Sequence, residues 1–229
     1  MSKILHTEIR ALEKKLLVLS ARIEEAVHHA AKAVETRDRG LAEEVIRDDD
    51  DIDRMEVEFE EEALKVLALH QPVAVDLRCI IALMKMNDDL ERLGDLATTV
   101  AKQGLVLMQN PEKVPPCDLS GMAEKACAMI RTSVDAMVRL DAGLARAVRR
   151  TDKEMDALHA ANSAAIRNAI RQDVDAVDSY LAYYLISRTL ERMGDHAKNM
   201  ADDVVYRIEG AIVRHSGGRP SGDGVPPKL

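Results

Sequence analysis

The sequence predicts an all-α protein built as two tandem antiparallel three-helix bundles, six helices in all. Three observations predict this fold class: the apolar residues are mostly aliphatic, they recur at helical spacing, and the two halves of the chain repeat one another. Hydrophobic residues make up 47% of the 229 residues, but aromatic residues only 2%. A core of Leu, Ala, Met, Ile and Val with few aromatic side chains favours helix packing over sheets.

The first half of the chain predicts three long helices. In the first, apolar residues recur at intervals of three and four up to a turn near residue 37, where we expect Gly40 to supply the permissive backbone. The second is expected at 41–69 and ends before Pro72, because proline cannot continue the hydrogen-bond ladder. The third is expected at 75–108. The stripe of the first helix is Ile9, Leu12, Leu16, Leu19, Ile23, Val27, Ala30 and Val34.

A proline-rich stretch divides the chain into two units. We expect a first unit at 1–109, a linker at 110–117 and a second unit at 118–213. In the second unit the helices are expected to begin near residue 118, to turn at 141–143, to break after Arg171 and to resume at 177–213. The Gly- and Pro-rich residues 214–229 are expected to form a disordered tail.

Two segments of the first half return in the second. Asp-Arg-Gly-Leu-Ala at 38–42 returns as Asp-Ala-Gly-Leu-Ala at 141–145, which is 103 residues later. Glu-Arg-Leu-Gly-Asp at 91–95 returns as Glu-Arg-Met-Gly-Asp at 191–195, which is 100 residues later. Each repeat therefore holds three helices with short antiparallel connections.

Each half also carries two acidic pairs at i, i+4 spacing, which places the carboxylates of a pair on one helical face. The midpoint of the four positions is residue 72 in the first half and lies between residues 173 and 174 in the second, inside the expected interhelical turns. An antiparallel hairpin therefore sets the two pairs of each half level with one another. The eight residues are Asp49, Asp53, Glu91, Asp95, Asp152, Asp156, Glu191 and Asp195.

Clustered carboxylates need a positive partner, because each close pair is repelled by roughly 2–3 kcal/mol at an effective dielectric near 20. Arg92 and Arg192 lie about 100° around the helix from the acids, so cations are favoured over these arginines. Oxygen ligands suit hard ions such as Mg, Ca, Mn or iron. Glu56 and Asp88 are further candidate ligands, and His159 takes the place of Glu56 in the second repeat.

A solvated helix face is the usual explanation of one acidic i, i+4 pair. The matching register in both halves favours metal sites over that explanation. Gly94 and Gly194 also favour metal sites, since a glycine inside a helix costs about 1 kcal/mol relative to alanine and marks a close approach of the backbone.

The bulk properties exclude several function classes. A net charge of −8 disfavours non-specific binding to nucleic acid. No apolar stretch approaches the ~20 residues of a membrane-spanning helix, and the N-terminus becomes charged too early for a signal peptide. Cys79, Cys117 and Cys127 lack metal spacing and are typical of reduced thiols. We therefore expect a cytoplasmic protein with no direct membrane insertion.

The segments at 71–78 and 89–95 resemble the first repeat of the PhoU family, and the segment at 189–197 resembles the second. The resemblance extends over residues 4–210. It implies two three-helix bundles side by side, Glu/Asp-x-x-x-Asp motifs that hold multinuclear iron clusters or other ions such as Mn, Mg, Ca or Zn, and homodimers. It also implies a non-enzymatic negative regulator of the phosphate-starvation response, acting between the ATPase of a phosphate ABC transporter and a sensor histidine kinase.

Two alternatives stay open. A carboxylate-bridged di-metal enzyme needs Glu-x-x-His motifs on two helices and glutamates from two others, and only Glu25 and His28 show that spacing. A metal-free structural helical module is the other alternative. The second site also departs from the first, because Arg188 stands where the first repeat has Asp88.

Overall fold

The structure, a computed structural model, describes residues 3–109 and 114–210. These residues form helices and no strand, which confirms the all-α class. The elements are α1 (Lys3–Thr36), α2 (Arg39–His70), α3 (Ala74–Leu107), α4 (Leu119–Arg139), α5 (Ala142–Gln172), the short 3-10 helix η1 (Val174–Ala176) and α6 (Val177–Glu209).

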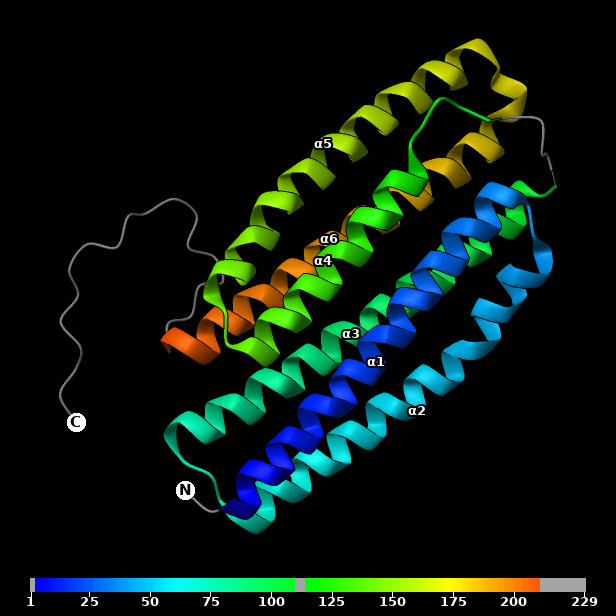
Figure 1. The fold of residues 1–229 in the computed structure, drawn as a ribbon. Coiled ribbons are helices and arrows are strands. Elements are labelled where there is room, and N and C mark those ends of the chain that lie inside the picture. Colours follow the sequence, from blue (N-terminus) through cyan, green and yellow to red (C-terminus); the bar gives the residue numbers. More distant parts are fainter. Residues whose placement is uncertain (1–2, 110–113, 211–229) are drawn as a thin grey trace, which may run out of the picture.

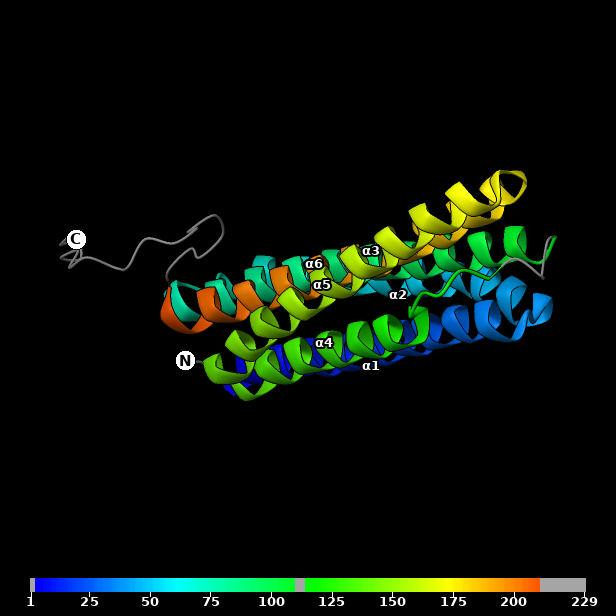
Figure 2. The same ribbon diagram turned by 90° about the horizontal axis from the view of Figure 1, so that it is seen from above.

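The two repeats lie side by side as antiparallel three-helix bundles (Figure 1). Helix α3 packs against α6 and α1 packs against α4, so α2 and α5 lie at the outer edges of the molecule. Seen from above, α1 and α4 share one layer and α3 and α6 the other (Figure 2). Because α3 and α6 run in opposite directions, the repeats are related by an approximate two-fold axis that passes between these two helices.

Aspartate caps start three of the helices. Asp38, Asp118 and Asp141 each accept a hydrogen bond from a backbone N–H in the first turn of α2, α4 and α5 respectively. Such caps satisfy N–H groups that have no partner within the helix. They explain why the expected starts near residues 41, 118 and 142 agree with the structure to within two residues.

The expectation for Gly40 is wrong. The left-handed residue between α1 and α2 is Arg37, with φ 57°, while Gly40 lies in the first turn of α2. Arg37 also contacts α6: its Nη2 donates a 2.5 Å hydrogen bond to the hydroxyl of Tyr183, and its guanidinium lies over the Tyr183 ring. Leu140 adopts the same conformation, with φ 54°, at the equivalent position of the second repeat, so a left-handed residue follows the first helix of both repeats.

The expected end of the last helix at residue 213 is also wrong. Helix α6 ends at Glu209, because Gly210 adopts φ 70° and donates its N–H to the carbonyl oxygen of Tyr206 at 2.9 Å. This is the usual left-handed glycine cap. The expected tail at 214–229 and residues 110–113 of the expected linker lie outside the described residues.

One continuous core crosses both repeats. The apolar stripe predicted for the first helix is buried throughout, as is Phe59. A buried ion pair adds a polar connection between the repeats: Nη2 of Arg207 donates to Glu13 at 2.8 Å, and Nη1 donates to the carbonyl oxygen of Met137 at 3.0 Å. The side chains of Arg207 and Glu13 are only 10% and 16% exposed. Arg207 of α6 thus contacts both α1 and α4.

We expect Arg207→Met to lower the free energy of unfolding by about 3–5 kcal/mol, because it leaves the Glu13 carboxylate buried without its partner. Urea unfolding followed by circular dichroism measures this loss. The control is Arg22→Met, which removes the exposed pair of Arg22 with Glu25 and is expected to change stability by about 0.5 kcal/mol or less. Equal losses in the two variants would show that the buried pair has no special role.

Candidate functional site

The first acidic constellation comprises Asp49 and Asp53 on α2 and Glu91 and Asp95 on α3. The two helices approach closely at Gly94, where a Cβ atom would lie 3.1 Å from Cγ2 of Ile52 and 3.5 Å from Oδ1 of Asp49. The glycine therefore lets side chains of α2 lie close to the backbone of α3. It also leaves the Asp49 carboxylate directly against α3.

The four carboxylates lie close enough to perturb one another. Burial raises the pKa of Asp49 and of Glu91, and the charges of Asp53 and Asp95 raise both further. The predicted register thus brings the four groups into electrostatic contact. Within residues 3–109 and 114–210, no three His, Cys, Asp or Glu side chains are already arranged to hold a metal ion.

Arg92 does pair with this constellation, contrary to the expectation from its position on the helix. Its Nε lies 3.2 Å from Glu91, and its Nη1 lies 3.3 Å from Asp95. The long side chain of Arg92 can bend back across the 100° that separates its Cβ direction from that of Glu91. The guanidinium is 61% exposed, so solvent screens these pairs and they offset little of the repulsion.

The second constellation has a resident cation that the sequence analysis missed. Nζ of Lys198 lies 2.7 Å from both Asp152 and Asp195, and so joins α5 to α6. Burial alone would lower the pKa of Lys198, but the hydrogen bonds and charges of the two aspartates raise it well above its usual value. The lysine therefore stays charged between the two carboxylates.

The same position in the first repeat is Thr98, 100 residues earlier. Its hydroxyl is buried beside Asp49 and lowers the pKa of that group, although no hydrogen bond of ordinary geometry joins them. A comparison of the two repeats at this position would have revealed the difference from the sequence. The first constellation contains a neutral hydroxyl where the second contains an ammonium group.

Two of the remaining candidate ligands, Glu56 and His159, are already engaged by side chains of the third helix of their own repeat. Nδ2 of Asn87 donates to the Glu56 carboxylate at 3.0 Å, and Nδ1 of His159 lies 3.0 Å from Oγ of Ser187. Asn87 and Ser187 are equivalent positions, so the repeat extends to these side-chain pairs. Burial and the charge of Arg188 lower the pKa of His159, which favours the neutral ring in the second repeat.

A cavity of about 350 Å³ adjoins the first constellation and is bounded by α2, α3 and α6; we call it the inter-repeat cavity. His196 lines it, although the sequence analysis left this residue out of the sites. Nδ1 of His196 lies 2.9 Å from Oδ1 of Asp89, so the histidine of one repeat contacts the other. The lining residues are Asp49, Arg92, Asp95, Leu96, Thr98, Thr99, Lys102, Arg192 and His196.

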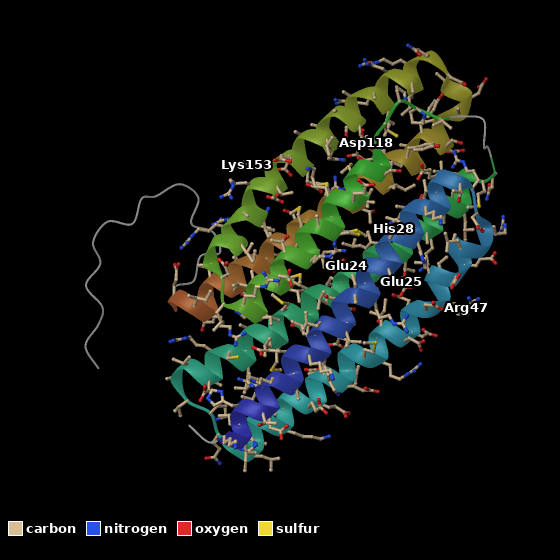
Figure 3. The ribbon with its side chains drawn as sticks, viewed as in Figure 1. Glu24, Glu25, His28, Arg47, Asp118 and Lys153 are labelled. Atoms are coloured by element: carbon tan, nitrogen blue, oxygen red, sulfur yellow. The ribbon has the colours of Figure 1, made fainter. Side chains whose placement is uncertain are left out.

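The pair that suggested a di-metal enzyme lies elsewhere. Glu25 and His28 are both exposed on α1 (Figure 3). Glu25 accepts a hydrogen bond from Arg22 at 3.1 Å. Neither residue lines the inter-repeat cavity.

The model of the PhoU domain matches residues 16–104 and 119–204, one domain in each repeat. The chain belongs to the PhoU family. A phosphate-specific transport system accessory protein PhoU homolog from Pseudomonas aeruginosa is 34% identical over 217 residues, which are 94% of this chain and 90% of that protein. The homolog from Pseudomonas putida is 33% identical over 94% of this chain and 85% of its own length.

Solved PhoU structures share the whole fold. The crystal structure of PhoU from Pseudomonas aeruginosa superposes with a TM-score of 0.84 at 33% identity, covering 90% of this chain and 99% of that one. The phosphate transport system regulatory protein PhoU from Streptococcus pneumoniae gives a TM-score of 0.83 at 26% identity, covering 91% and 99%. The arrangement of two PhoU domains is therefore confirmed.

As in the sequence analysis, no helix of the described chain is long and apolar enough to span a membrane.

The raised pKa values give the metal-free protein a distinct pH dependence. When the pKa of an acid is higher in the folded than in the unfolded state, the stability it contributes is present at low pH and is lost as the pH rises through the folded pKa. We therefore expect Asp49→Asn/Glu91→Gln to stabilise the protein in the presence of a chelator at pH 7, but not at pH 4. Thermal unfolding at the two pH values measures the difference.

The matched control is Asp50→Asn/Glu61→Gln, which removes two exposed acids of α2 that form no ion pair in the described part of the chain. A stabilisation at pH 7 of the same size in the control would assign the effect to net charge and not to the constellation.

Proposed function

We propose that this protein is a cytoplasmic, metal-binding regulator of phosphate uptake and not an enzyme. It acts as a negative regulator of the phosphate-starvation response, as a homodimer, between the ATPase of a phosphate ABC transporter and a sensor histidine kinase. Membership of a family whose relatives are named phosphate-specific transport system accessory proteins supports the link to phosphate transport. The acidic constellation at Asp49, Asp53, Glu91 and Asp95 is the observation that carries the metal-binding part.

The first constellation suits a hard metal ion. Besides burial, the charges of Asp53 and Asp95 raise the pKa of Asp49 and Glu91, so a bound divalent or trivalent cation would remove an existing repulsion. Gly94 adds no side chain of its own beside the Asp49 carboxylate. Mg, Ca, Mn and iron fit the all-oxygen ligand set, and several carboxylates can bridge more than one iron ion.

The second constellation suits a metal less well, because Lys198 already supplies the positive charge. A cation that binds Asp152 and Asp195 has to displace two 2.7 Å charge-assisted hydrogen bonds. We therefore propose that the two sites differ in affinity, with the first taking metal more tightly.

Metal content per chain, measured by mass spectrometry after reconstitution with Fe or Mn and buffer exchange, tests this asymmetry. We expect Glu91→Ala/Asp95→Ala to remove most of the bound metal and Glu191→Ala/Asp195→Ala to remove little. We expect Lys198→Thr, which gives the second site the residue of the first, to raise its metal affinity by about tenfold or more. The reciprocal Thr98→Lys is expected to lower occupancy of the first site.

Negligible metal in the wild type with every ion would reduce the acidic constellations to structural groups. Equal losses in both double-alanine variants, with no gain in Lys198→Thr, would instead show that the lysine does not control access to the second site.

The regulatory part has an independent test in cells. We expect deletion of the gene to leave phosphate-starvation genes expressed in phosphate-rich medium, because the repressing link between transporter and kinase is lost. A reporter fused to such a promoter measures this, and complementation with the wild-type gene is the control. Normal repression in the deletion strain would refute the regulatory role but leave the metal sites untouched. Oxygen consumption by the Fe(II)-loaded protein would instead support the di-metal enzyme.

A further inference from the structure

The wall of the inter-repeat cavity is basic, although the chain as a whole is acidic. The chain carries a net charge of −8, yet permanently cationic side chains outnumber carboxylates in the wall of this cavity. They come from both repeats, since Arg92 and Lys102 lie on α3 and Arg192 lies on α6. The opposing carboxylates are Asp49 and Asp95. A cavity that gathers cations from two repeats is suited to an anion that neither repeat could surround alone.

Two of these cations have no strong protein partner. Arg92 is paired with Glu91 and Asp95. In contrast, the side chain of Arg192 forms no hydrogen bond or ion pair with any residue in the ranges 3–109 and 114–210. Lys102 forms no ion pair there either, although its charge lowers the pKa of Asp49. Arg192 and Lys102 are therefore available to a ligand.

The basic character of the cavity is specific to the first repeat's side of the two-fold axis. The position equivalent to Lys102 is Asp202, which is buried and lies 3.6 Å from Arg149. Lys198 at the second constellation is likewise engaged by two aspartates. At these two equivalent positions the second repeat therefore provides no unpaired cation.

We propose that the inter-repeat cavity binds a phosphate-type oxyanion through Arg192 and Lys102, with Arg92 and His196 on the adjoining walls. Arginine presents several N–H donors that match tetrahedral oxyanions, and lysine adds a point charge. The volume of about 350 Å³ lies at the lower end of the range for small-molecule sites, ~300–1,000 Å³, and so suits a small anion. The choice of phosphate among oxyanions rests on the proposed function.

The cavity shares Asp49 and Asp95 with the first acidic constellation, so an anion here would lie beside a bound metal ion. The same chemistry can come from free inorganic phosphate or from the terminal phosphoryl group of a nucleotide. Isothermal titration calorimetry of the full chain with inorganic phosphate, and separately with ATP, distinguishes these two sources. Each titration is run on metal-free protein and on protein in Mg²⁺ buffer, and metal content is measured on the same samples.

We expect Arg192→Gln and Lys102→Gln each to weaken binding of the preferred anion by about tenfold, since each removes a charge-assisted contact. Metal content is expected to stay unchanged, because neither residue is a proposed metal ligand. The matched controls are Arg167→Gln and Lys65→Gln, which remove the same charges at exposed positions of α5 and α2. They are expected to bind the anion as the wild type does.

The proposal is overturned if neither phosphate nor ATP binds the wild type under either condition. It is also overturned if the site variants and the controls bind equally, or if Arg192→Gln loses metal and anion together. A wild type that holds no metal but binds phosphate through Arg192 and Lys102 would refute the metal-binding role and support the cavity proposal, so the two failures are distinguishable.

Discussion

The packing of α3 against α6 is the constraint on which the rest of the molecule depends. These two helices carry the Glu-x-x-x-Asp motifs, at Glu91/Asp95 and Glu191/Asp195, and they run antiparallel across the approximate two-fold axis. Each then pairs with the outer helix of its own repeat to complete an acidic constellation. The contact between the repeats therefore sets the spacing of the two constellations and places Arg92 and Arg192 in one cavity beside the first of them.

The helices, the repeat and the level register of the acidic pairs could be predicted because they depend on periodic or local signals. Aliphatic spacing predicts the buried stripes, Pro72 predicts the end of α2, and mid-helix Gly94 predicts a close approach of the helix backbone, which the structure places against α2. Such features follow from the backbone geometry of one helix or one hairpin. They do not require knowledge of how the two repeats meet.

The errors and omissions have other physical origins. Arg37, and not Gly40, takes the left-handed conformation, and Leu140 does so at the equivalent position, so neither turn uses the glycine that usually signals such a cap. His196 was not among the predicted site residues, yet it contacts Asp89 across the interface. Arg92 was considered as a counter-ion and set aside, but its long side chain reaches beyond the face predicted by its Cβ direction. Lys198 was missed although it stands three residues after Asp195, a spacing that brings side chains together on a helix. Long-range contacts and side-chain reach are not encoded in helical periodicity.

The substitution of threonine by lysine between positions 98 and 198 has a broader consequence. In a homodimer with two identical sites, every mutation changes both sites together, because both are copies of one sequence. A tandem repeat within one chain removes that linkage, so one constellation can acquire an internal ammonium group while the other keeps its hydroxyl. The duplicated architecture thus allows a single polypeptide to present two versions of one acidic motif on one rigid scaffold, and their chemistries can diverge one residue at a time.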